Sequence, residues 1–379
     1  MVHMASYVLS SHDGFGLGHV RRNISIAEAI LRHDRDADIT VVTGVPNDLP
    51  WLTRRDIRVV RVPSMVKNDA GDYVNASLSF EDAVARRADM FLDVIEQRRP
   101  DVVVVDRHPY GTGGELRPGL ERCRQLGVAT VLGLRDILDD APSVWAELAS
   151  DRWHDVESFY DEAVVYGARH LCDHQVEYGL TMRPTYTGWV LDEPAIRRRP
   201  TVDPRLLVIA AGGGADGAEV RRIGVELIGT NASWRGVMVA GPAAAAATKS
   251  FGHERMQVVG TVDSCRALLA RAGASIQMAG YNTTLEALAA GVRPMLLPRR
   301  APRREQAIRA TRLAALGLAD VVDEGADTAE LSWLLEQPRR VSPATLRMAG
   351  IALDGAERTA ALVGNLAGVR MPRNLAVAR

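Results

Sequence analysis

The chain has 379 residues, of which 47% are hydrophobic and 25% are charged, as in a globular protein with two or three domains and ample buried core. Its formal net charge of −1 gives no overall electrostatic attraction to nucleic acid or to a membrane surface. The three cysteines are odd in number and far apart, as expected for reduced thiols in a cytoplasm. No signal peptide and no apolar run near ~18 residues is visible, so we expect a cytoplasmic protein without a membrane span.

In the first half, short apolar runs alternate with longer helical stretches, which predicts βα units and a parallel sheet. Helices are predicted at residues 20–33 and 80–98. Strands are predicted at residues 7–10, 39–43, 57–62, 102–105, 129–133, 163–166 and 184–189. A polar stretch rich in Arg and Pro, residues 191–204, follows and is predicted to be an interdomain linker.

The second half repeats this alternation. Strands are predicted at residues 206–211, 236–240, 257–259, 275–278 and 292–298, and the closing helices at 328–336, 343–349 and 352–366. We therefore predict an α/β protein with one Rossmann-like domain at residues 1–190 and a second at residues 205–379. Two doubly wound domains of this kind are expected to face a cleft and to bind ligands at the carboxyl ends of their strands.

The first predicted strand leads into a glycine-rich loop, residues 11–22, with the sequence SHDGFGLGHVRR. Glycines at alternate positions, among them Gly16 and Gly18, let the main chain approach a ligand without obstruction by Cβ atoms. A dinucleotide-binding loop instead requires G-x-G-x-x-G and an acidic residue at the end of the second strand, where this chain has Thr43 and Gly44. The loop therefore argues against dinucleotide binding.

A second glycine loop opens the other half. Gly212, Gly213 and Gly214 follow a predicted strand and precede Asp216 and a helix. Main-chain amides in such a nest, at the start of a helix, bind phosphate without a lysine.

The most informative segment is residues 279–312, AGYNTTLEALAAGVRPMLLPRRAPRREQAIRATR. Gly280 and Asn282 supply a turn before a helix, and Thr283 and Glu286 are spaced as in a capping box. A helix start of this kind is also a ready anion site. Glu305 and Gln306 then open the next helix, after a basic loop at residues 299–304.

These three segments, in this order, resemble those of GT-B glycosyltransferases, especially the MurG-type enzymes, and related nucleotide-sugar hydrolases share the first loop. The resemblance implies a GT-B fold, an acceptor-side first domain and a nucleotide-sugar donor, UDP- or dTDP-linked, in the second. It implies no cofactor and no catalytic metal. The donor-binding residues that it implies are Gly16, Gly18, Gly212, Gly213, Gly214, Gly280, Asn282, Thr283, Thr284, Glu286, Glu305 and Gln306, with Glu286 on the ribose, the two threonines at the diphosphate and the last pair on the sugar.

His19, at the start of the first helix, is the candidate general base by the same resemblance. An imidazole suits this role because its pKa lies near neutral pH, although a histidine here is also consistent with simple packing on its helix. A carboxylate would orient the ring, and Asp106, at the end of a buried strand, is the first candidate before Asp13 and Asp136. Asp106 as a mere turn former remains an equal alternative.

The leading hypothesis is an inverting, metal-independent transferase of the hexosyltransferase type acting on a small-molecule or lipid-linked acceptor. A nucleotide-sugar hydrolase and a non-catalytic GT-B partner protein are the alternatives. The cluster His170, Cys172 and His174 has the residue types of a zinc site but no fourth ligand nearby in the sequence. Four aromatic residues suit either an acceptor pocket or a core, namely Trp145, Trp153, Phe159 and Tyr160.

Overall fold

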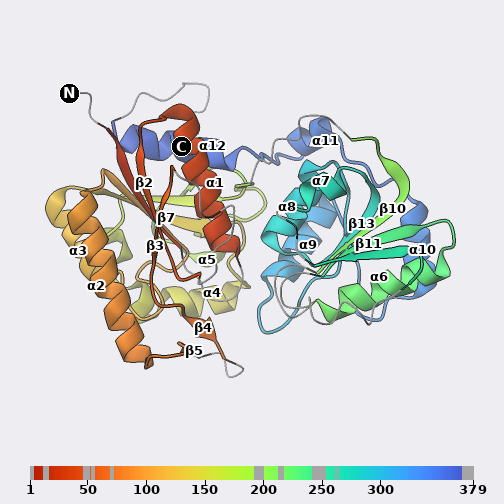
Figure 1. Ribbon diagram of the computed structural model, residues 1–379, viewed down its shortest axis with the longest axis horizontal. Coiled ribbons are helices and arrows are strands. Elements are labelled where there is room, and N and C mark those ends of the chain that lie inside the picture. Colours follow the sequence, from red (N-terminus) through yellow and green to blue (C-terminus); the bar gives the residue numbers. More distant parts are fainter. Residues whose placement is uncertain are drawn as a thin grey trace. The chain divides into compact units, whose positions relative to one another are not determined.

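The computed structural model describes residues 4–11, 17–45, 52, 56–68, 72–191, 200–211, 217–240, 253–260, 262 and 264–368. The chain divides into two compact units, Met1–Asp192 with Asp354–Arg379 and Glu193–Leu353 (Figure 1). Each is an α/β unit built on a parallel sheet, which confirms the predicted fold class. None of the described helices has both the length and the apolar character needed to cross a membrane.

The first unit is built on a seven-stranded sheet in the order β3-β2-β1-β6-β7-β8-β9. Its central strands form because they are short runs of β-branched residues, and all five residues of β6 are buried. The strands are β1 (Ser6–Ser10), β2 (Asp38–Thr43), β3 (Arg58–Arg61), β6 (Val102–Asp106), β7 (Ala129–Arg135), β8 (Glu162–Tyr166) and β9 (Thr185–Tyr186).

The helices of the first unit include the two predicted ones and others that were not predicted. Ser79 begins α2 by accepting a hydrogen bond from the Asp82 amide, and Arg99 ends the helix in the left-handed conformation. The elements are α1 (Gly18–His33), α2 (Phe80–Arg98), α3 (Arg117–Leu126), α4 (Ala141–Leu148), η1 (Asp151–Trp153), η2 (Val156–Ser158) and α5 (His174–Tyr178), with a small hairpin of β4 (Val66–Lys67) and β5 (Tyr73–Val74).

The last described helix, α12 (Gly355–Leu366), corrects the predicted domain boundary. The prediction placed residues 205–379 in one domain, but α12 lies beside α1 in the first unit (Figure 1). Glu357 pairs with Arg32 and, at 2.6 Å, with His33 of α1, and Thr359 donates a hydrogen bond of 3.0 Å to Thr187. The second unit therefore ends before α12. The predicted linker is described only at Leu191 and from residue 200, since residues 192–199 lie outside the described ranges.

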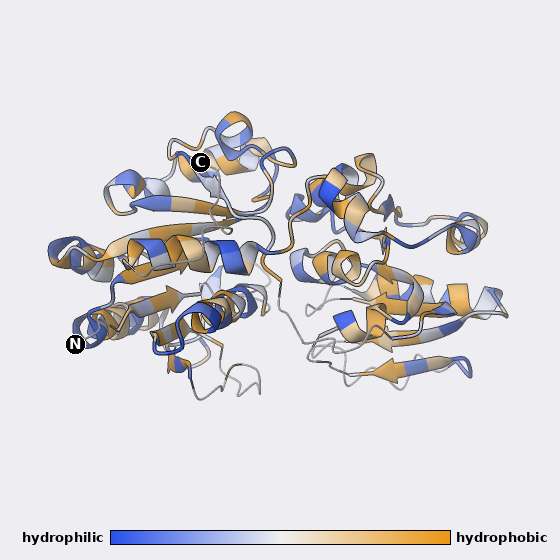
Figure 2. Cartoon of the chain, turned by 90° about the horizontal axis from the view of Figure 1, so that it is seen from above, coloured by the Kyte–Doolittle hydropathy of each residue, from blue (hydrophilic) through white to orange (hydrophobic). Residues whose placement is uncertain are grey.

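The second unit has a six-stranded parallel sheet in the order β12-β11-β10-β13-β14-β15. Two buried apolar clusters pack on it, one containing Leu207 and Ile209 and the other Leu206 and Val208, so alternate residues of β10 serve different clusters. Figure 2 shows the strands largely in the hydrophobic colour. The strands are β10 (Asp203–Ala210), β11 (Arg235–Val239), β12 (Met256–Val259), β13 (Ala272–Gln277), β14 (Met295–Leu296) and β15 (Asp320–Val321), and the helices are α6 (Ala218–Thr230), α7 (Arg266–Leu269), α8 (Tyr281–Ala289), α9 (Glu305–Ala315), α10 (Thr328–Glu336) and α11 (Pro343–Met348).

Candidate active site

In each sheet the strand order reverses at one point, between β1 and β6 in the first unit and between β10 and β13 in the second. Ligands of doubly wound sheets bind beyond the carboxyl ends of the strands at such a point. His19 lies in the first turn of α1, which follows β1, and Asp106 is the last residue of β6. The Gly280 turn follows β13 and leads into α8. His19 and Asp106, and the start of α8, therefore lie at the switch point of their own unit, whereas Glu305 and Gln306 follow β14, the next strand of the second sheet.

In the first unit, Arg22 joins the two predicted catalytic residues. Its guanidinium donates to both carboxylate oxygens of Asp106, with Nη2 at 2.9 Å from Oδ1 and 2.8 Å from Oδ2 and Nε at 3.1 Å from Oδ2. His19 Nδ1 lies 3.3 Å from Asp106 Oδ1 and 3.1 Å from Arg22 Nη2. His19 and Asp106 are thus brought together as predicted, with an arginine as the third member of the cluster.

The cluster is mostly buried, and this burial shifts the pKa values of His19 and Asp106. Burial lowers the pKa of His19 below its ordinary value; attraction to Asp106 opposes this, and the positive charges of Arg22 and Arg135 reinforce it. Burial alone would raise the pKa of Asp106, but Arg22 and His19 outweigh it and hold that pKa below its ordinary value. At neutral pH the site therefore contains an ionised Asp106 beside a neutral imidazole that retains 20% of its side-chain exposure.

Tyr166, the last residue of β8, supports Arg22 from the neighbouring strands. The guanidinium carbon of Arg22 lies 5.1 Å from the centroid of the Tyr166 ring, within cation–π range. The ring has room because Gly133 stands opposite; a Cβ atom at position 133 would lie only 2.2 Å from the Tyr166 hydroxyl. Arg22, Tyr166 and Gly133 thus form a support beneath the His19–Asp106 pair.

The other residues considered for the first site have different positions. Asp136 is buried and accepts hydrogen bonds from its neighbour's amide, at 2.8 Å, and from Trp189 Nε1, at 3.2 Å, so it supports the packing of the first unit. Gly18 is the first residue of α1. Gly16 and Asp13 lie outside the described residues.

In the second unit, the start of α8 differs from the prediction. Gly280 is the N-cap, with φ −64° and ψ 150°, and no side chain caps the helix. Thr283 instead points its hydroxyl at the carbonyl oxygens of Met278 and Gly280, both at 3.3 Å. The predicted capping box of Thr283 and Glu286 is therefore wrong, because the N-cap is Gly280 and α8 begins at Tyr281, three residues earlier than the box requires. Asn282 is partly exposed in the first turn, and Thr284 is fully buried.

Glu286 is free of any capping role and lies on the side of α8 that meets α7. It is 6% exposed, and its Oε1 accepts a hydrogen bond of 3.2 Å from Ser264. Ser264 Oγ in turn accepts a hydrogen bond of 3.1 Å from the Arg266 amide at the start of α7. A carboxylate fixed in this way, with one oxygen held by a hydroxyl, is suited to accept hydrogen bonds from a vicinal diol.

Glu305 and Gln306 open α9 and are both buried, at 4% and 8% exposure. Arg299, in the loop after β14, contacts both of them: its Nη2 donates 2.7 Å to Glu305 Oε1, and its amide donates 3.2 Å to Gln306 Oε1. The predicted sugar-contacting pair is therefore together in space, and Arg299 already engages it.

Arg309, one turn further along α9, fixes the turn before α8. It is 2% exposed, and its Nη1 donates 2.8 Å to the carbonyl of Ala279, while its guanidinium carbon lies 5.8 Å from the Tyr281 ring centroid. Because the Arg309 guanidinium is buried and bonded to a main-chain carbonyl, its role is to hold the Gly280 turn in place.

The remaining sequence candidates do not form a described site. Gly212, Gly213 and Gly214 lie outside the described residues. The ring nitrogens of His174 lie 3.3 Å from the carbonyl oxygen of Cys172 and 3.1 Å from that of Arg135, so main-chain oxygens occupy both sides of the ring. Within the described ranges, no group of His, Cys, Asp and Glu side chains is arranged to hold a metal ion.

Sequence reasoning gave no role to three residues that build these sites: Arg22, Ser264 and Arg309. It considered Arg299 only as part of a basic loop that could add charge near the diphosphate, whereas the structure places it on Glu305 and Gln306. Arg22 had a signal, since the pattern Gly-x-Gly-His-x-x-Arg places it one helical turn after His19, on the same face. Arg309 likewise stands four residues after Glu305 on a helix face that is otherwise buried. Ser264 and Arg299 lie in loops whose side-chain directions no periodic pattern encodes.

The two doubly wound units, with a final helix that returns to the first, define the class of protein: the chain has the GT-B fold. No protein-family profile and no curated protein matches the sequence.

Solved glycosyltransferase structures match nearly the whole chain. A glycotransferase of kitacinnamycin covers 96% of this chain and 99% of its own, with a TM-score of 0.68 and 16% identity. The match to the calicheamicin glycosyltransferase CalG4 covers 98% of this chain and 100% of CalG4, with a TM-score of 0.65 and 18% identity. The match to MurG of Acinetobacter baumannii covers 96% of this chain and 100% of MurG, with a TM-score of 0.61 and 14% identity. At these identities the likeness establishes the fold, and function depends on the sites.

Proposed function

We propose that this protein is a glycosyltransferase that moves a sugar from a nucleotide diphosphate to an acceptor hydroxyl, with inversion and without a catalytic metal. The observation that carries the proposal is the His19–Arg22–Asp106 cluster at the switch point of a GT-B unit. A neutral, partly exposed imidazole backed by an ionised carboxylate is the arrangement that a general base requires.

In the proposed reaction, the acceptor hydroxyl gives its proton to His19 Nε2 as its oxygen forms a bond to the anomeric carbon of the donor sugar. The bond from that carbon to the diphosphate breaks, and the diphosphate leaves with the electron pair. Nδ1 of His19 carries a proton in this tautomer and faces Asp106 Oδ1, which stabilises the imidazolium as it forms. Attack opposite the leaving group inverts the anomeric centre.

The second unit would hold the donor. Glu286, fixed by Ser264, would accept hydrogen bonds from the ribose hydroxyls. Amides of the first turn of α8, with Thr283, would face the diphosphate, since a helix start favours negative charge. Thr284 is fully buried and would not reach it, against the prediction from the sequence. Glu305 and Gln306 would contact the sugar hydroxyls in competition with Arg299. Gly16, Gly18 and Gly212–Gly214 remain predicted donor contacts.

The test is nucleotide release from UDP- and dTDP-sugars, with and without a pool of hydroxyl acceptors, by wild type and His19→Ala. We expect acceptor-dependent release that falls by about 10²–10⁴-fold in the variant, as for loss of a general base, with nucleotide affinity within about threefold of wild type. His33→Ala is the matched control, because His33 lies at the far end of the same helix and pairs with Glu357.

Undiminished turnover in His19→Ala would remove His19 from the role of base. Release of free sugar at the same rate without any acceptor would assign the protein to the nucleotide-sugar hydrolases instead, with His19 activating water.

A further inference from the structure

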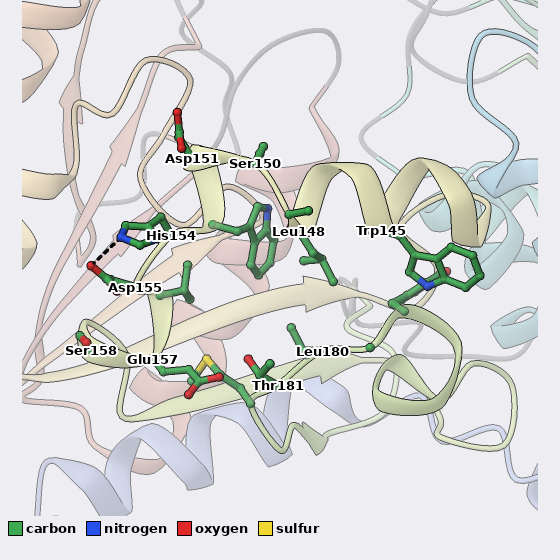
Figure 3. Close-up of a pocket in the computed structure, with 16 residues that line it drawn as sticks. Trp145, Leu148, Ser150, Asp151, His154, Asp155, Glu157, Ser158, Leu180 and Thr181 are labelled. Atoms are coloured by element: carbon green, nitrogen blue, oxygen red, sulfur yellow. Dashed lines mark ion pairs between the residues drawn. The ribbon is translucent and has the colours of Figure 1, made fainter.

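The first unit contains a cavity of about 600 Å³ that none of the predicted donor or base residues lines (Figure 3). It lies between α4, the turns η1 and η2, and the end of α5 with the segment that follows. Its volume falls within the range of sites for small organic ligands, ~300–1,000 Å³. The apolar and aromatic side chains in its wall are Trp145, Leu148, Trp153, Tyr178, Leu180 and Met182.

Hydrogen bonds link this wall to two arginines at the carboxyl ends of β6 and β7, Arg107 and Arg135. Arg107 directly follows Asp106 and donates a hydrogen bond of 2.9 Å to Glu147 Oε2 on α4. Trp153 of the cavity wall donates a hydrogen bond of 3.4 Å to Oε1 of the same carboxylate. On the other side of the cavity, the hydroxyl of Tyr178 accepts a hydrogen bond of 3.3 Å from the amide of Leu138. The carbonyl of Leu138 accepts a hydrogen bond of 3.0 Å from Arg135.

Arg135 is the last residue of β7, and its charge lowers the pKa of His19. The cavity is therefore built on the segments that follow β7 and β8, at the same edge of the sheet as the cluster.

One end of the cavity carries an excess of negative charge. Asp151, Asp155 and Glu157 line it, and neither Arg nor Lys is among the described residues of the lining. His154 Nε2 lies 3.1 Å from Asp155 Oδ2. Figure 3 shows these side chains at one end and Trp145 at the other. Arg152, which follows Asp151 in the sequence, and Arg183, which follows Met182, do not line the cavity.

We infer that this cavity binds the acceptor, and that the acceptor is a flat, apolar molecule that is neutral or cationic rather than a lipid-linked diphosphate. The apolar wall would cover an aromatic or polycyclic ring, and the acidic end would repel an anion. The inference rests on the proposed glycosyl transfer and names the acceptor class for it.

Three naphthols with one ring system and different charges test the inference. They are 6-(aminomethyl)-2-naphthol, which is cationic at pH 7, neutral 2-naphthol, and anionic 6-hydroxynaphthalene-2-sulfonate. Their affinities for the full chain are measured at low salt by the anisotropy of naphthol fluorescence, in parallel with a UDP and dTDP titration by calorimetry. We expect the cation to bind at least about tenfold more tightly than the sulfonate, with 2-naphthol between them.

Two variants and a control sharpen the comparison. Trp145 is 54% exposed, so Trp145→Ala should leave the fold intact and weaken all three naphthols by about fivefold or more. Asp151→Asn combined with Glu157→Gln should reduce the difference between cation and sulfonate to about threefold or less. Trp333→Ala removes another exposed tryptophan, 62% exposed on α10 of the second unit, and should change none of these affinities.

The outcomes separate this inference from the function on which it rests. Binding of UDP or dTDP without binding of any naphthol overturns the cavity assignment and leaves the proposed function standing. Sulfonate binding as tight as that of the cation overturns the charge class. Naphthol binding without any nucleotide binding removes the proposed function and, with it, the acceptor role of the cavity.

Discussion

His19 sits between opposite charges, and the balance between them decides its reactivity. Asp106 raises the pKa of His19, whereas burial and the charges of Arg22 and Arg135 lower it. Because a base must be neutral to accept a proton, a lowered pKa keeps His19 competent at neutral and mildly acidic pH, at the cost of some basicity.

Replacing Asp106 with Asn should therefore move the pKa of His19 further down, since it removes the neighbour that raises that pKa. The acidic limb of the pH–rate profile should shift to lower pH, while turnover at pH 7 falls by about 10²–10⁴-fold through loss of imidazolium stabilisation. Titration of the His19 ring by NMR checks the direction without any substrate. A His19 pKa that rises in Asp106→Asn would contradict the raising effect assigned to Asp106, since Arg22 lowers that pKa.

At the scale of elements, β7 and β8 support the cluster through one tight contact. Gly133 pairs in register with Asp106 of β6, and the Tyr166 hydroxyl fills the space that a side chain at position 133 would take. Strands β6 and β7 thus provide both the Asp106 carboxylate and the space for the Tyr166 ring beside Arg22.

Gly133→Ala should displace Tyr166 and reduce the free energy of unfolding of the first unit by about 1–3 kcal/mol, the usual cost of overpacking. It should also lower turnover, because the Arg22 support moves. Gly229→Ala is the control: this α6 glycine has open space around it, so the substitution should raise stability by about 0.5–1 kcal/mol. Denaturant unfolding measures both variants, and an unchanged midpoint for Gly133→Ala would contradict the proposed support.

The same scale shows how far local patterns predict these elements. Buried strands such as β6 were predictable because four consecutive valines leave few alternatives to a central parallel strand. The start of α8 was misassigned because the spacing of Thr283 and Glu286 fits a capping box. The contact that fixes the preceding turn, from Arg309 to the Ala279 carbonyl, is not visible in the local sequence. A contact between residues 30 positions apart, such as Arg309 with Ala279, has no local signature.

At the scale of the whole molecule, α12 shows the same limit for domains. Its sequence predicts an amphipathic helix but not which unit it covers, since that depends on contacts with Arg32 and Thr187, far away in the chain. His19 lies in the first unit and Glu286 in the second, each close after a strand of its own unit, whereas α12 follows α11 and no strand.

Gly355, at the start of α12, offers a direct test of this domain assignment. A Cβ atom there would lie 2.3 Å from the carbonyl oxygen of Gly188, so Gly355→Ala should reduce the free energy of unfolding of the first unit by about 1–3 kcal/mol. Hydrogen exchange should rise in α1 and around residues 185–191 and stay unchanged in α6 and α8. Increased exchange in α6 and α8 instead would place α12 with the second unit.

The central claim, that the second unit binds a nucleotide diphosphate through Glu286, has one direct measurement: calorimetric titration of UDP, dTDP and GDP into wild type and Glu286→Ala. Because Glu286 is 6% exposed and held by Ser264, its loss should weaken the preferred nucleotide by about 10–100-fold. Glu330→Ala, at an exposed position on α10, should bind like wild type. Selective binding of one nucleotide that Glu286→Ala weakens is the predicted result, and binding of none of the three to wild type would contradict the account.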